Sequence, residues 1–128
     1  SRKENILEPG ELITAVMLPA PSNNTRSHYI KFGARESHDW ALADVAVVVE
    51  LTGDQCKKAE IVLGAAAPVP IKSREAAEVL RGKVIDEALA VRAGEASMQQ
   101  ATPLEHNAYK IPVFKALVKR AVMKTLET

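Results

Sequence analysis

Residues 43–65, ADVAVVVELTGDQCKKAEIVLGA, contain two apolar runs joined by a short polar turn. Apolar side chains recur at every second position, at Val45, Val47, Val49 and Leu51 in the first run and at Ala59, Ile61 and Leu63 in the second. This alternation is typical of strands with one buried face, and Gly53-Asp54 favours a chain reversal between them. We therefore predict an antiparallel hairpin with strands over about 43–51 and 58–65.

Two further strands are predicted before the hairpin. Residues 12–18 follow the turn signal Glu8-Pro9-Gly10 and stop at Pro19, and residues 27–35 form the second strand. The two faces of this second strand carry Tyr29, Lys31, Gly33 and Arg35 on one side and His28, Ile30, Phe32 and Ala34 on the other. The face that contains Ile30 is largely apolar and suits a core. The face that contains Lys31 is therefore expected to point away from the core.

Three helices are predicted after the sheet. Ser73 is a suitable N-cap for a helix over 74–81, which Gly82 ends. Asp86 caps a second helix over about 87–100, in which Gly94 is a weak point. A third helix begins at Asn107 and reaches about 126, with Pro112 in its first turn.

Strands followed by helices predict an α+β domain, a four-stranded antiparallel sheet with a three-helix layer on one face. We predict a single domain over 1–128, with a lead-in over 1–10, the sheet over 11–65 and the helices over 73–126. The polar start lacks a signal peptide and an initiating Met, so we expect the chain to be part of a larger polypeptide.

Composition excludes several functions. A net charge of +1 and an aromatic share of 4% argue against nucleic-acid binding, and no apolar run is long enough to span a membrane. The single cysteine, Cys56, cannot form an internal disulfide, which fits a cytoplasmic location, and we expect it to be a free surface thiol in the hairpin turn. The three histidines have no metal-ligand spacing, and no glycine-rich phosphate loop is present, so neither a metal site nor a self-sufficient nucleotide site is expected.

The strand over 27–35 and the loop after it hold the candidate site. Lys31 and Arg35 share a face with Gly33 between them, and Trp40 follows the bend. Lysines on strands are most often solvated. If Lys31 has a specific role, an interdomain salt bridge explains its position as well as a contact with a cofactor phosphate, ribitol or flavin edge does. Adjacent Ser37, His38 and Asp39 cannot converge as a nucleophilic triad, so no catalytic residue is predicted.

Four motifs now identify a resemblance. They are NILEPGELI at 5–13 with VMLP at 16–19, YIKFGAR at 29–35 with DWALA at 39–43, IVLGAAAPVP at 61–70 with EAAEVLRG at 75–82, and HNAYKI at 106–111. In this order they resemble the C-terminal domain of the FAD-binding subunit of the molybdenum hydroxylases, which include xanthine dehydrogenase, carbon monoxide dehydrogenase and aldehyde oxidoreductase. The resemblance covers nearly the whole chain, although Ser37-His38 and Trp40 are not general features of that family.

The resemblance implies a fold and a role. It implies the same four-stranded sheet with three helices, and an FAD held mainly by N-terminal FAD-binding domains of the same subunit. Iron–sulfur clusters and a molybdopterin centre would lie on partner subunits and supply electrons that pass through FAD to an acceptor. Lys31 matches a lysine that contacts FAD, Ile13 matches an aliphatic neighbour of FAD, and the loop with Arg35, Asp39 and Trp40 matches a segment beside the flavin.

A different class of function remains open at this point. Exposed Trp and Arg side chains are enriched at interface hot spots, so the Lys31/Trp40 face also fits a non-enzymatic α+β module that docks a protein partner. In either case the chain is not expected to contain an acid, base or nucleophile, because a cofactor would perform any redox chemistry.

Overall fold

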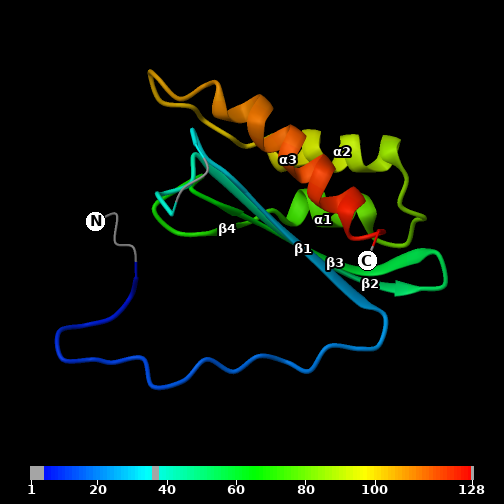
Figure 1. Ribbon diagram of the computed structural model, residues 1–128, viewed down its shortest axis with the longest axis horizontal. Helices are drawn as coiled ribbons and strands as arrows, with labels where there is room; N and C mark the ends of the chain where they lie inside the picture. Colours follow the sequence, from blue (N-terminus) through cyan, green and yellow to red (C-terminus); the bar gives the residue numbers. More distant parts are fainter. Residues whose placement is uncertain (1–4, 36–37, 128) are drawn as a thin grey trace.

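A computed structural model describes residues 5–35 and 38–127 as a sheet with one layer of helices. The sheet is antiparallel with the order β1-β2-β3-β4, and the helices cover one of its two faces (Figure 1). The elements are β1 (Thr25–Phe32), β2 (Ala43–Thr52), β3 (Gln55–Gly64), β4 (Ile71–Lys72), α1 (Arg74–Leu80), α2 (Glu87–Ser97) and α3 (Lys110–Lys124). The predicted α+β class, with four strands and three helices, is confirmed.

The β2–β3 hairpin forms the centre of the core. Val45 pairs with Leu63 and Val47 pairs with Ile61 across the two strands, and all four side chains are buried. Burial of such a side chain contributes about 1.5–3 kcal/mol relative to leaving it exposed. From the helices, the core receives Leu80, Leu89, Phe114, Leu117, Val118 and Val122. The apolar alternation in the sequence therefore identified the buried face of the sheet correctly.

The helix ends agree with the predicted signals in part. The Asp86 carboxylate accepts a hydrogen bond from the Leu89 N–H at 2.7 Å, which is the expected N-cap of α2. Gly82 follows α1 with a φ of +72°, a conformation that glycine adopts without strain. Pro112 lies in the first turn of α3, as predicted, but α3 begins at Lys110 rather than at Asn107.

Gly94 has a packing role that the sequence did not reveal. A Cβ at this position would lie 2.6 Å from the Lys115 carbonyl oxygen of α3. The weak point predicted in α2 is therefore a place where α2 packs tightly against the backbone of α3, in a contact that a larger residue would disturb.

The predicted strand over 12–18 is wrong. None of the described residues from 5 to 22 belongs to a strand or a helix, and the side chains of Val16, Met17 and Leu18 are 78–93% exposed. A strand requires a neighbour to pair with its backbone, and this segment runs past the sheet without meeting one (Figure 1). Alternation and flanking prolines indicate an extended chain, but they do not supply a partner.

The fourth strand, Ile71–Lys72, lies beyond residue 65, where the predicted sheet ends. Ile71 pairs with Leu63 and Lys72 with Val62, so β4 adds a short edge to β3. The sheet therefore covers residues 25–72 rather than 11–65. A strand of two residues after the prolines at 68 and 70 has too little pattern to be recognised, and pairing with β3 determines it.

Cys56 was also predicted incorrectly, because it is buried rather than at the surface. Its backbone N–H donates to the Lys83 carbonyl at 2.9 Å, and its carbonyl accepts from Gly82 N–H at 2.7 Å. These bonds hold the chain after α1 against the start of β3, and the Cys56 side chain belongs to the hydrophobic core. Burial raises the pKa of the Cys56 thiol.

Candidate functional site

The uncovered face of the sheet carries polar groups contributed by β1. Tyr29 and Lys31 are exposed on this face, whereas Ile30 points to the other side and packs against the core. This division of β1 agrees with the faces predicted from the sequence. Phe32 fits less well, because its side chain is 41% exposed where the strand leaves the sheet.

Three residues form a row across this face. Lys31 is the register partner of Asp44, and Asp44 is the register partner of Gly64. A Cβ at Gly64 would lie 2.0 Å from Asp44 Oδ1, so the carboxylate occupies the space above the glycine. Burial raises the pKa of Asp44, and the nearby Lys31 charge opposes that effect. Burial also raises the pKa of Tyr29, with a smaller contribution in the same direction from Asp44.

A hydrogen-bond network ties the loop after β1 to this row. Lys31 Nζ donates to the Asp39 carbonyl oxygen at 2.5 Å. Arg35 donates from Nε and Nη2 to Asp39 Oδ2, at 2.9 and 2.7 Å. Leu42 N–H donates to the Phe32 carbonyl at 2.8 Å and closes the base of the loop. The structure therefore brings together three of the five predicted site residues, Lys31, Arg35 and Asp39.

Trp40 stands next to this network and is almost uncovered. Its side chain is 94% exposed, the highest value among the large apolar side chains that the structure describes. A large ring in water is a costly arrangement unless another surface covers it. Trp40 therefore offers an exposed apolar ring on the residue that follows Asp39, whose carbonyl binds Lys31.

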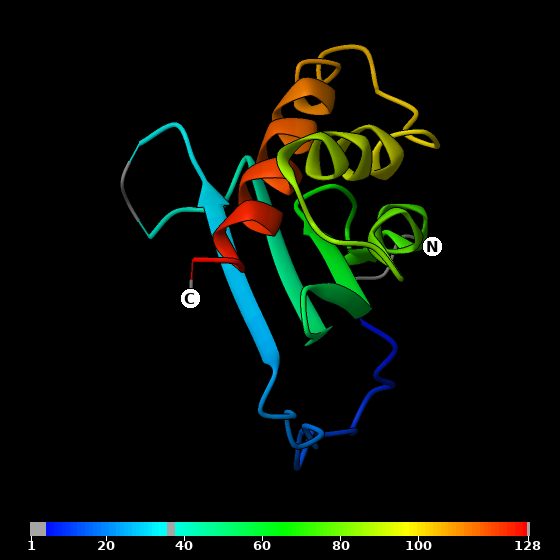
Figure 2. The same cartoon turned by 90° about the vertical axis from the view of Figure 1, so that its right-hand side faces the viewer.

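Ile13 is not brought to the other predicted residues. It lies in the extended segment before β1 with 63% of its side chain exposed. Figures 1 and 2 show this segment well apart from the loop that follows β1. Glu36 and Ser37, inside the predicted loop, lie outside the described residues. The role of Ile13 therefore stays a prediction.

Asp44 and Gly64 are not among the site residues predicted from the sequence. Asp44 was the one acidic side chain near the start of an otherwise apolar run, and Gly64 ended the following strand. Only the strand register, which is a long-range property, makes them neighbours of Lys31.

Other kinds of site receive no support from the part of the chain that the structure describes. Within residues 5–35 and 38–127, no three His, Cys, Asp or Glu side chains gather closely enough to hold a metal ion. None of the described helices has the length and apolar character needed to cross a membrane.

Comparison with known proteins identifies the family. The sequence profile of the CO dehydrogenase flavoprotein C-terminal domain matches residues 28–125. The chain belongs to this family. The match includes all four strands except the start of β1, all three helices and the Lys31–Trp40 region.

Individual relatives agree with this assignment. The carbon monoxide dehydrogenase medium chain of Afipia carboxidovorans is 39% identical over 80 residues, which are 62% of this chain and 27% of that protein. The medium chain from Hydrogenophaga pseudoflava is 28% identical over 121 residues, which are 91% of this chain and 42% of that protein. The chain thus spans less than half the length of these relatives.

Solved structures give the same result. Reconstituted CO dehydrogenase from Oligotropha carboxidovorans superposes with a TM-score of 0.83 at 29% identity, over 93% of this chain and 43% of that one. Quinoline 2-oxidoreductase from Pseudomonas putida 86 gives a TM-score of 0.77 at 26% identity, over 86% of this chain and 39% of that one. The fold is therefore that of a component of molybdenum hydroxylase oxidoreductases.

Proposed function

We propose that this chain forms one wall of the flavin site in the FAD-binding subunit of a molybdenum hydroxylase such as xanthine dehydrogenase or CO dehydrogenase. The observation that carries the proposal is the network of Lys31, Arg35 and Asp39 beside the exposed Trp40, in a chain of a flavoprotein domain family. FAD, when bound, would supply the redox chemistry, taking electrons from molybdopterin and iron–sulfur centres on partner subunits and passing them to an acceptor.

The residues present fit one edge of such a cofactor. Lys31 presents an ammonium group whose position is fixed by the Asp39 carbonyl, and such a group favours negative charge in its neighbourhood. Trp40 provides an apolar ring that can exclude water from a planar ligand. Because the chain has no glycine-rich phosphate loop, most cofactor contacts are assigned to FAD-binding domains upstream in the same subunit.

Each residue is assigned a positioning or binding role. Lys31 binds FAD, and Arg35 and Asp39 hold the loop in place. Trp40 covers the cofactor, and Ile13 is proposed as an apolar neighbour of FAD contributed by the extended segment. We propose that none of the chain's residues acts as an acid, base or nucleophile and that the chain has no turnover when isolated. We also propose a cytoplasmic complex with iron–sulfur and molybdopterin subunits, without nucleic-acid or membrane partners.

The test uses the subunit with its upstream domains and the Lys31→Ala variant. Loss of one hydrogen bond to a charged group should weaken FAD binding by about tenfold and slow flavin reduction. Lys57→Ala is the matched control, because Lys57 forms only an exposed ion pair with Glu50 near the far end of the hairpin. Unchanged FAD affinity and reduction kinetics in Lys31→Ala would remove the role of Lys31, while FAD binding by the wild-type subunit would still support the assignment of the subunit.

A second candidate is a non-enzymatic interaction module that docks a protein through the Lys31/Trp40 face. The near-complete exposure of Trp40 favours this alternative, because buried Trp side chains dominate many interfaces. Trp40→Ala separates the two. Loss of subunit association with unchanged FAD affinity favours docking, whereas loss of FAD affinity in an intact complex favours the flavin wall.

A further inference from the structure

Two residues without an assigned role, Asp44 and Gly64, lie in the same row as the lysine proposed to bind FAD. Lys31, Asp44 and Gly64 follow one another across β1, β2 and β3 on the uncovered face of the sheet. Residues directly opposite each other in antiparallel strands have their Cβ atoms about 4.5–5.5 Å apart. A carboxylate is therefore the cross-strand neighbour of the Lys31 ammonium group.

Gly64 leaves the space in which the Asp44 carboxylate lies. A Cβ at position 64 would meet Asp44 Oδ1 at 2.0 Å and Asp44 Oδ2 at 2.7 Å, so both oxygens lie over the glycine. The carboxylate thus leans towards β3, while Lys31 lies on the other side of it, on β1. Lys31 Nζ donates to the Asp39 carbonyl at 2.5 Å. The two opposite charges are therefore neighbours, each held by a different anchor.

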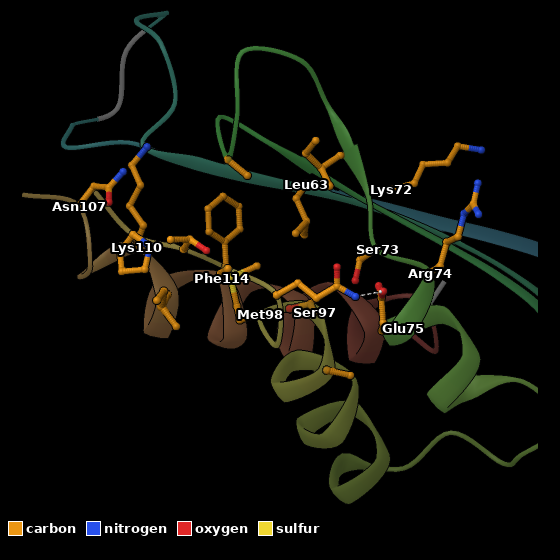
Figure 3. A pocket seen from close by; sticks show the side chains of 18 residues that line it. Leu63, Lys72, Ser73, Arg74, Glu75, Ser97, Met98, Asn107, Lys110 and Phe114 are labelled. Carbon is orange, nitrogen blue, oxygen red and sulfur yellow. Dashed lines mark hydrogen bonds between the residues drawn. The ribbon is translucent and has the colours of Figure 1, made fainter. Parts of the chain in front are cut away.

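The backbone beneath the carboxylate is held in place. Gly64 is paired with Asp44 in the sheet, and the next residue, Ala65, has a φ of +56°, a left-handed conformation that alanine rarely adopts. Lys110 Nζ donates to the Ala65 carbonyl at 3.0 Å. Figure 3 shows Lys110 in the wall of the pocket between the helices and the sheet, reaching from α3 towards the sheet. A side chain added at position 64 would therefore displace the carboxylate more readily than the backbone.

The charge of Asp44 is felt by the residues of β1. Burial raises the pKa of the Asp44 carboxyl, and the Lys31 charge lowers it. Burial also raises the pKa of Tyr29, and Asp44 adds to that increase. Because Lys31 is exposed and Asp44 is half-buried, water weakens the interaction of the two charges without removing it. A ligand beside Lys31 would therefore experience the field of both charges.

We propose that Asp44 is a positioning residue that acts through Lys31 and limits the positive charge that this lysine presents to FAD. Held over Gly64, its carboxylate offsets part of the field of the ammonium group while the group stays directed to the Asp39 carbonyl. The inference rests on the proposed function, because it requires FAD beside Lys31. A positive field favours the reduced cofactor, which carries more negative charge, so Asp44 lowers the preference of the site for that form.

Two substitutions with opposite expected effects test the proposal in the subunit with its upstream domains. Asp44→Asn removes the negative charge and keeps the shape of the side chain, so the reduced cofactor should bind about fivefold more tightly relative to the oxidised one. This change corresponds to a rise of about 20 mV in the flavin midpoint potential for two electrons. Gly64→Ala should push the carboxylate towards Lys31 and lower the potential.

The double variant and a distant control complete the design. Gly64→Ala combined with Asp44→Asn should have the potential of Asp44→Asn alone, because no charge remains to be displaced. Asp54→Asn, in the exposed hairpin turn, should leave the potential unchanged. A general loss of stability would not move the potential in opposite directions in the two single variants. If Gly64→Ala fails to fold, Asp44→Asn and its control decide the question.

A measurement without FAD examines the two charges themselves. In the 128-residue chain, NMR titration of the Asp44 carboxyl should show a higher pKa in Lys31→Met than in the wild type, since the neighbouring positive charge is gone. An unchanged pKa would show that the charges do not interact and would overturn the inference.

The outcomes separate this inference from the function on which it rests. Absence of FAD from the wild-type subunit would overturn both. A wild-type subunit that binds FAD, together with an Asp44→Asn variant whose potential is unchanged or lowered, would overturn the role of Asp44 and leave the flavin wall in place.

Discussion

The carboxylate of Asp44 lies directly over the backbone of Gly64, so that a Cβ on the glycine would meet Asp44 Oδ1 at 2.0 Å. This relationship joins β2 to β3 beside Lys31, and it makes a substitution at Gly64 a test of the geometry of the site.

Gly64→Ala should displace the Asp44 carboxylate and destabilise the fold by about 1 kcal/mol, the low end for overpacking, since the blocking atom is the end of a side chain. Denaturant unfolding measures the change. In the Asp44→Ala background the same substitution should cost less, because the carboxylate is gone. Equal costs in both backgrounds would show that Asp44 does not occupy that space.

Gly94→Ala should be more damaging than its helical position suggests. Alanine normally stabilises a helix by about 1 kcal/mol relative to glycine. Here the new Cβ would meet the Lys115 backbone carbonyl at 2.6 Å, and a backbone atom cannot rotate away. We expect a loss of about 2–3 kcal/mol in the free energy of unfolding. Arg92→Ala, on the exposed side of α2, is the control and should change stability little. A stabilised Gly94→Ala variant would contradict the close approach of α2 and α3.

Asp44 should make stability depend on pH. Burial raises its pKa above the usual 3.8, so the folded chain holds the proton more tightly than the unfolded chain. The resulting stability is fully present below pH 3.8 and is lost as the pH rises through the raised pKa. Asp44→Asn should therefore be more stable than the wild type at neutral pH, with a difference that shrinks as the pH falls through the raised pKa towards 3.8 and changes no further below it.

Thermal unfolding between pH 3 and 7 measures this effect. Asp54→Asn, in the exposed hairpin turn, controls for the removal of a carboxylate elsewhere on the chain. A difference between Asp44→Asn and the wild type that stays constant across this range would rule out the titration of Asp44 as its cause.

The Cys56 thiol should resist modification in the folded chain. It is fully buried and burial raises its pKa, so the reactive thiolate is both scarce and inaccessible at neutral pH. Labelling with a thiol reagent should be slow in buffer and fast in denaturant. Rapid stoichiometric labelling of the folded protein would show that the Cys56 thiol is accessible at the surface.

Local features were predictable because short stretches of sequence determine them. The alternation through Val45 and Val47 identified the buried face of β2, and Asp86 marked the start of α2. The loop from Lys31 to Asp39 was recognised as one unit for the same reason, since its residues are close in sequence.

Features that depend on pairing between distant segments could not be predicted. Residues 12–18 have the composition of a strand, but the described structure gives them no neighbour, whereas Ile71 and Lys72 become a strand because β3 lies beside them. The position of Asp44 over Gly64 follows from the register of β2 and β3, and the burial of Cys56 accompanies its bonds to the distant residues Gly82 and Lys83.

The bond from Lys31 to the Asp39 carbonyl has an evolutionary consequence. The acceptor belongs to the main chain, so every amino acid at position 39 offers it. Replacing Asp39 would deprive Arg35 of its carboxylate but would leave Lys31 its carbonyl acceptor. Lineages can therefore vary the side chains of this loop, and with them the character of the neighbouring surface, while the lysine keeps its anchor.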